Sequence, residues 1–189
     1  GVFLYYLFPS DTLKTYLEYR LSQTNPDITV TIDHVSPVIP PGIKLHDVGI
    51  VHQNEVLVDL DNLKIMPGIL SLFSDKSTVN FKGRVNVGTF IGRAEINDNA
   101  WSQEVKCDGR IIGIQVQGIP ALQRLPAEKI AGVLNGNFTY ANTGPNRSLE
   151  GKLTLSQFRI ELNKAVFNVK SLEFRDIDAE LMLKNDTLT

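Results

Sequence analysis

The stretch TVNFKGRVNV, residues 78–87, decides the fold class of this chain. Its apolar side chains occupy every second position, at Val79, Phe81, Val85 and Val87, with polar residues or glycine between them. Successive side chains of a β-strand point to opposite faces, so this period predicts a strand with one apolar and one polar face. We expect the apolar side to be the inner face of a sheet.

The same period of two recurs before and after this stretch, separated by turn-forming residues. A parity change near Ser156 and Gln157 predicts a bulge. Two segments break the pattern: 67–73 is short and apolar, and 119–130 predicts one or two short helices. The further strands that we predict cover 28–32, 43–52, 56–65, 90–97, 103–116, 133–140, 149–162, 165–174 and 176–184.

A helix is predicted over 10–24, with Ser10 as its N-cap and Asn25-Pro26 after its end. Its charged residues Lys14 and Glu18 lie opposite the apolar face in this prediction. The helix either covers an open end of the sheet or lies at a membrane surface. Its predicted apolar face consists of Leu13, Tyr16, Leu17 and Leu21.

The chain begins with its most apolar stretch, residues 1–9. Nine helical residues rise only about 14 Å, far less than a bilayer core of about 30 Å. We interpret this stretch as the end of a truncated membrane anchor, and the alternative is a short buried segment or a domain-swapping arm. The rest, 10–189, is predicted to be one β-domain that is incomplete at its C-terminal end. The membrane-proximal residues are Phe3, Leu4, Tyr5, Tyr6, Leu7 and Phe8.

The predicted fold is mainly β: an elongated, curved antiparallel sheet, half-pipe or open barrel-like, with an N-terminal amphipathic helix and short helical inserts. So few helices leave the apolar side of the sheet with little to cover it. One solution is a half-pipe with an apolar groove of acyl-chain size, and the alternative is a sealed core. The candidate groove residues are Val79, Phe81, Val85, Val87, Phe158, Ile160 and Leu162.

Composition and motifs argue against several classes of function. Lys and Arg number 19 against 21 Asp and Glu, which gives a net charge of -2 and no basic field for nucleic acid. The single cysteine, Cys107, is predicted to be a buried strand residue. His46 and His52 lie about 20 Å apart on a straight strand, too far to share a metal ion. We therefore predict no catalytic residues, no metal site and no cofactor.

Three segments carry a resemblance to a known family. They are FPSDTLK at 8–14 after the apolar start, PVIPPGIKL at 37–45, and the pair IAGVLNGNFTY at 130–140 and LEGKLTL at 149–155. Together they resemble the bacterial type II secretion system protein GspN family, and the last pair is also similar to AsmA-like proteins. The shared motifs are structural, so no catalytic residue is carried over.

The resemblance implies a periplasmic β-domain anchored in the inner membrane and associated with type II secretion. Its implied role is a non-enzymatic scaffold for other secretion-system or envelope proteins, bound at an unpaired sheet edge. Similarity to AsmA-like proteins implies instead an apolar groove that binds phospholipid or transfers it between membranes. These two functions are the hypotheses that the sequence supports.

Overall fold

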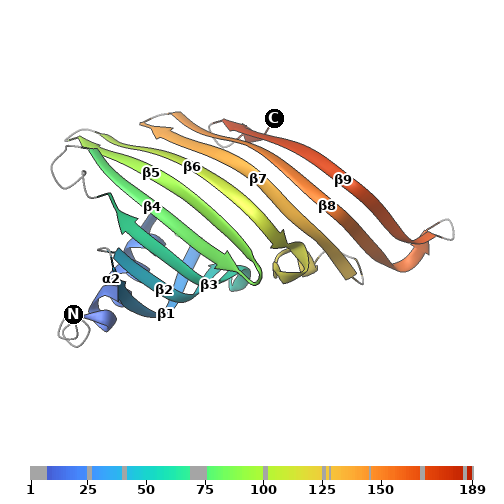
Figure 1. Cartoon of the computed structure of the whole chain (residues 1–189), viewed down its shortest axis with the longest axis horizontal. Coiled ribbons are helices and arrows are strands. Elements are labelled where there is room, and N and C mark those ends of the chain that lie inside the picture. Colours follow the sequence, from blue (N-terminus) through green and yellow to red (C-terminus); the bar gives the residue numbers. More distant parts are fainter. Residues whose placement is uncertain are drawn as a thin grey trace.

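The computed structural model describes residues 8–24, 27–39, 42–68, 76–99, 102–124, 127, 129–144, 146–166, 169–184 and 187–188. One antiparallel sheet of ten strands dominates it, with the strands in sequence order and helix α2 (Ser10–Thr24) beside the first (Figure 1). The predicted mainly-β fold with one N-terminal helix is confirmed. No helix in the described ranges combines the length and apolar character needed to cross a bilayer.

Each strand pairs with the next one along the chain, so the sheet is a simple meander. Two short 3-10 turns interrupt it: η3 (Leu122–Arg124) lies within the predicted helical segment 119–130, and η2 (Val116–Gly118) lies just before it. The strands are β1 (Ile28–Val38), β2 (Gly42–His52), β3 (Glu55–Pro67), β4 (Lys76–Val85), β5 (Gly88–Asn99), β6 (Ser102–Gln115), β7 (Lys129–Thr143), β8 (Asn146–Val166), β9 (Val169–Lys184) and β10 (Thr187–Leu188).

The predicted strands match these bounds closely, with three differences. Strand β4 ends at Val85, because Asn86 takes a left-handed conformation (φ 51°) and begins the turn that contains Val87. Strand β1 continues through Pro37. Proline has no N–H, and an edge strand tolerates it because the N–H groups on the outer side of the strand need no partner strand. The boundary predicted at Arg175 lies inside the single strand β9, and the start of the predicted strand 165–174 belongs to β8, which continues to Val166.

At two places the alternation of side chains between the two faces of the sheet shifts by one residue. Gln157 has φ 52° and falls outside the register of β8 with both neighbours, which confirms the predicted bulge. In β1, Ile32 and Val35 are both buried although three positions separate them. Asp47, with φ 46°, lies at the corresponding place in β2. Both changes keep apolar side chains on the same side of the sheet along the full length of each strand.

The buried core is centred on strands β1 to β4 and also includes Ile114 of β6. Leucines 13 and 17 of α2 pack against it, as does Ile119 from the segment between η2 and η3. That segment also meets the start of β3, where the Ala121 N–H donates to the Leu57 carbonyl at 3.3 Å. The apolar side is therefore covered over the first strands. The buried apolar residues in the described structure are Ile32, Val35, Leu45, Val48, Leu60, Val85, Ile114, Val116 and Ile130.

Helix α2 seals the outer edge of β1 with side chains spaced four residues apart. The Ser10 hydroxyl donates to the Val35 carbonyl. The Lys14 ammonium donates to the Asp33 carbonyl at 3.0 Å, and a Glu18 carboxylate oxygen accepts from the Ile32 N–H at 2.8 Å. These bonds satisfy backbone groups that an edge strand otherwise leaves open to pairing.

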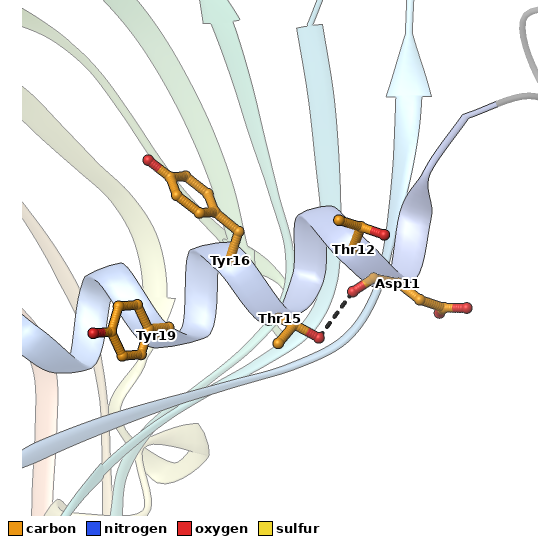
Figure 2. Close-up of a pocket in the computed structure, with 5 residues that line it drawn as sticks. All are labelled: Asp11, Thr12, Thr15, Tyr16 and Tyr19. Atoms are coloured by element: carbon orange, nitrogen blue, oxygen red, sulfur yellow. Dashed lines mark hydrogen bonds between the residues drawn. The ribbon is translucent and has the colours of Figure 1, made fainter.

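The helix therefore faces the sheet differently from the prediction. Lys14 and Glu18 lie against β1 because their long side chains reach its backbone, while Leu13 and Leu17 enter the core. Tyr16, predicted to be on the apolar face, is 55% exposed and points away from the sheet (Figure 2). The predicted contact of Leu21 lies outside the described side chains.

Candidate functional site

The candidate site is the apolar side of strands β4 to β9, here called the apolar face. It continues the side that carries the core, because Leu63 of β3 lies opposite Gly83 of β4 and Ile65 lies opposite Phe81. The cross-strand register extends it in two central rows, which contain no charged side chain. One row is Phe81, Gly92, Gly109, Phe138, Gly151 and Leu181, and the next is Gly83, Phe90, Ile111, Gly136, Leu153 and Ala179.

Aromatic rings lie over glycines on this face. A Cβ atom added at Gly109 would come within 2.3 Å of the Phe138 ring, and one at Gly83 within 2.0 Å of the Phe90 ring. At Gly92 it would meet both the Phe81 ring, at 2.3 Å, and a backbone carbonyl. A larger residue at Gly83 or Gly109 would displace the ring above it, and one at Gly92 would also collide with the backbone of β6. The rings lie flat over the glycines of neighbouring strands, so they cover this part of the sheet with a thin layer of aromatic side chains.

Exposure on this side is far higher in β9 than in the first strands, while Val85, Ile114 and Ile130 are still buried in β4, β6 and β7. Leu45 in β2 is 1% exposed, whereas Leu172, Phe174 and Leu181 in β9 are 41%, 45% and 37% exposed. The covering elements lie elsewhere: α2 packs against β1, and the η2–η3 segment packs against β7 and bonds to β3 through Ala121, whereas neither is placed over β9 (Figure 1). In the described ranges, strands β8 and β9 carry apolar side chains toward this side without a second layer above them.

The opposite side of the same strands, here called the polar face, is charged and hydrogen-bonded. Lys152 and Glu180 form an ion pair at 3.1 Å, and Arg159 contacts Glu173 at 3.3 Å. Nearby, the Thr154 hydroxyl donates to Asp178 at 2.8 Å. Asp176 likewise accepts a bond from the Ser156 hydroxyl at 2.7 Å, so both aspartates of β9 take part in cross-strand contacts. These contacts make β8 and β9 a strictly two-sided sheet.

The predicted groove residues fall into two groups. Val79, Phe81 and Val85 lie on β4, where Val85 is part of the buried core. Phe158 and Ile160 lie on β8 beyond the bulge, opposite Phe174 and Leu172 of β9. Leu162 follows two positions further in the same strand. The two groups are separated by four strand spacings, about 19 Å across the sheet, and are also offset along the strands, so they share a face without touching.

Val87 does not belong to this face. It lies in the turn between β4 and β5 and is 76% exposed, because the left-handed Asn86 ends the alternation before it. Among the predicted membrane-proximal residues, Phe8 packs against the core. Residues 3–7 lie outside the described part of the chain.

Cys107 is a half-buried free thiol on the apolar face, between Ala94 of β5 and Tyr140 of β7. Burial raises the pKa of this thiol, and the neighbouring Asp108 carboxylate raises it further. The thiol is therefore a weak nucleophile at neutral pH, which fits a lining residue better than a reactive one.

A histidine pair escaped the sequence analysis. His34 and His46 lie opposite each other in β1 and β2, and their rings stack with centroids 3.9 Å apart. Burial lowers the pKa of His46, and the positive charge of His34 lowers it further. The hairpin turn after Val38 could have revealed the pair, because it fixes this register. No three metal-ligating side chains gather anywhere in the described residues.

An open surface hollow of about 550 Å³ lies on the outer side of α2. Figure 2 shows its lining, Asp11, Thr12, Thr15, Tyr16 and Tyr19, all from this one helix. The Thr15 hydroxyl donates to the Asp11 carbonyl at 3.0 Å, a bond within the helix. With one carboxylate and no convergent partner from another described element, this hollow offers no arrangement for chemistry.

Comparison with known proteins adds no relative: no family model, no curated protein and no solved structure matches this chain.

Proposed function

We propose that the apolar face binds long apolar chains, such as the acyl chains of phospholipids, and that the protein is a non-enzymatic lipid-binding or lipid-transfer module. The observation that supports this most strongly is the difference in exposure on one side of one sheet, between 1% at Leu45 and 45% at Phe174. Apolar side chains that gather on one side and stay in water mark a surface that binds something apolar.

The dimensions of the apolar face suit an acyl chain. Six strands, β4 to β9, span about 24 Å across the sheet, because neighbouring strands lie about 4.8 Å apart. One leaflet of a bilayer has a hydrocarbon thickness of about 15 Å, half of the whole core. A chain lying across the strands would therefore meet apolar side chains and flat rings along its full length.

Substitution of single residues on opposite faces of β9 tests this proposal. Leu181 and Met182 are adjacent, 37% and 44% exposed, and Met182 lies opposite Glu150 on the polar face. We expect Leu181→Gln to weaken the binding of a fluorescent long-chain fatty acid about tenfold, through lost apolar contact. Met182→Gln is the matched control and should leave the affinity unchanged. Equal affinities of the two variants would refute the proposal, and circular dichroism would verify that both are folded.

The scaffold role in type II secretion remains a second candidate, and one observation favours it. Strand β10 pairs with β9 only at Leu183 and Lys184, so most of the outer side of β9 has no described strand beside it. Such an edge can accept a strand from another protein. An inner-membrane anchor and a periplasmic location belong to this candidate as proposals.

A further inference from the structure

A row of three lysines crosses the polar face near the covered end of the sheet. Lys44 of β2 lies directly opposite Lys64 of β3, which lies directly opposite Lys82 of β4. Residues directly opposite in an antiparallel sheet have Cβ atoms about 5 Å apart, and like charges in such positions repel. None of the three lysines forms an ion pair within the described residues.

The surroundings of this lysine row contain no compensating carboxylate at the adjacent register positions. The row ends on Ser36 in β1 and Ile91 in β5. Two residues along each strand, the neighbours are neutral, basic or histidine: Gly42, Met66 and Asn80 on one side, and His46, Asn62 and Arg84 on the other. Asp61 lies close by, but its carboxylate contacts Arg84 at 3.2 Å.

A hollow of about 310 Å³ lies over the row. Side chains of Lys44, Lys64, Lys82 and Arg84 line it together with Asn62, Thr89 and the Gly83 backbone. The lining thus offers four cations and two neutral polar groups, and no carboxylate. Lysine ammonium groups bind phosphate oxygens as point charges, and arginine adds directed N–H donors.

Three other lysines on the same face lie opposite carboxylates. Lys106 lies opposite Glu95, and Lys129 lies opposite Glu161. Lys152 pairs with Glu180 at 3.1 Å. A lysine opposite a carboxylate is the ordinary arrangement in a sheet. In contrast, none of Lys44, Lys64 and Lys82 lies opposite a carboxylate.

We propose that the lysine row is a binding site for a phosphate group, carried by a phospholipid head group or by a free phosphorylated molecule. The phosphate would supply the negative charge that the surrounding register positions lack. The site lies on the opposite side of the sheet from the apolar face, so it is independent of the proposed acyl-chain binding.

Two arms test the site and distinguish the two sources of phosphate. In the first, the thermal unfolding midpoint of the whole chain is measured in inorganic phosphate and in sodium chloride of equal ionic strength. In the second, flotation measures binding to vesicles of phosphatidylcholine alone or with added phosphatidylglycerol. The test variant is K44Q/K64Q/K82Q. The matched control is K106Q/K129Q/K152Q, which removes the same charge from the same face.

For the parent chain and the matched control, we expect phosphate to raise the unfolding midpoint, since a ligand of the folded state stabilises it. If the source is a head group, vesicles with phosphatidylglycerol should bind the test variant about a hundredfold more weakly, or about fivefold per lysine. Stabilisation by phosphate without vesicle binding assigns a free phosphorylated molecule. The proposal fails if both triple variants respond alike in both arms, or if the parent responds in neither. Because the test variant removes like charges, its midpoint without ligand should not fall.

Discussion

Replacing Leu45 by alanine is expected to lower the free energy of unfolding by about 3 to 4 kcal/mol, the usual cost of a fully buried leucine. Leu45 is 1% exposed and packs in the core that α2 and the first strands enclose. Leu172→Ala, on the same side of the sheet in β9, should cost less than about 1 kcal/mol, because Leu172 is already 41% exposed and leaves no cavity.

Urea unfolding of the two variants measures this difference directly. The comparison uses one residue type and one side of the sheet, so the two losses report how much covers each leucine, with Leu45 in a strand paired on both sides and Leu172 in a strand paired there on one side. Similar losses at Leu45 and Leu172 would mean that another layer covers β9 in solution, and the apolar face would then be an ordinary core.

Replacing Glu18 by alanine is expected to cost about 2 kcal/mol, although alanine is the better helix former. The change removes the acceptor of the Ile32 N–H, a charge-assisted bond of 2.8 Å, and Ile32 is buried. Glu18→Gln keeps an acceptor oxygen and should lose less than about 1 kcal/mol. Thr12→Ala, on the outer side of the same helix, should change stability by no more than about 0.5 kcal/mol.

The Glu18 variant should also expose the β1 edge to pairing, since the helix would no longer be fixed against it. Sedimentation analysis is expected to show concentration-dependent self-association of Glu18→Ala and not of Glu18→Gln. If Glu18→Ala is as stable and as monomeric as Thr12→Ala, the helix does not seal this edge.

Period and parity predicted the sheet well because both are local properties. The alternation over 78–85 and the parity change at Gln157 are each visible within about ten residues, and the structure has both. The division of β9 into two predicted strands at Arg175 is wrong: the register with β8 continues from Ser156 opposite Asp176 to Phe158 opposite Phe174, so one strand runs through Arg175.

The features that local patterns could not predict depend on the pairing register of the strands or on the length of a side chain. The His34–His46 stack and the row at Lys44, Lys64 and Lys82 join residues from different strands, so they appear only once pairing is fixed. The role of Glu18 was missed because helical periodicity assigns charged residues to solvent, while a long side chain can return to a backbone donor. Partial exposure of the apolar face likewise depends on how few elements cover it.

The most direct test of an open apolar face uses its own cysteine. Cys107 is the only cysteine of the chain and lies on this face between Ala94 and Tyr140. Its alkylation rate by a small maleimide can be followed by mass spectrometry at fixed pH, with and without a long-chain phospholipid delivered from cyclodextrin. Because its pKa is raised, the reaction should be slower than that of a free thiol and should accelerate as the pH increases.

If acyl chains lie on the apolar face, bound phospholipid should slow this alkylation several-fold, and Leu181→Gln should reduce the protection. An unchanged rate at Cys107 with phospholipid bound to the protein would contradict the account, as would a failure of the protein to bind phospholipid at all.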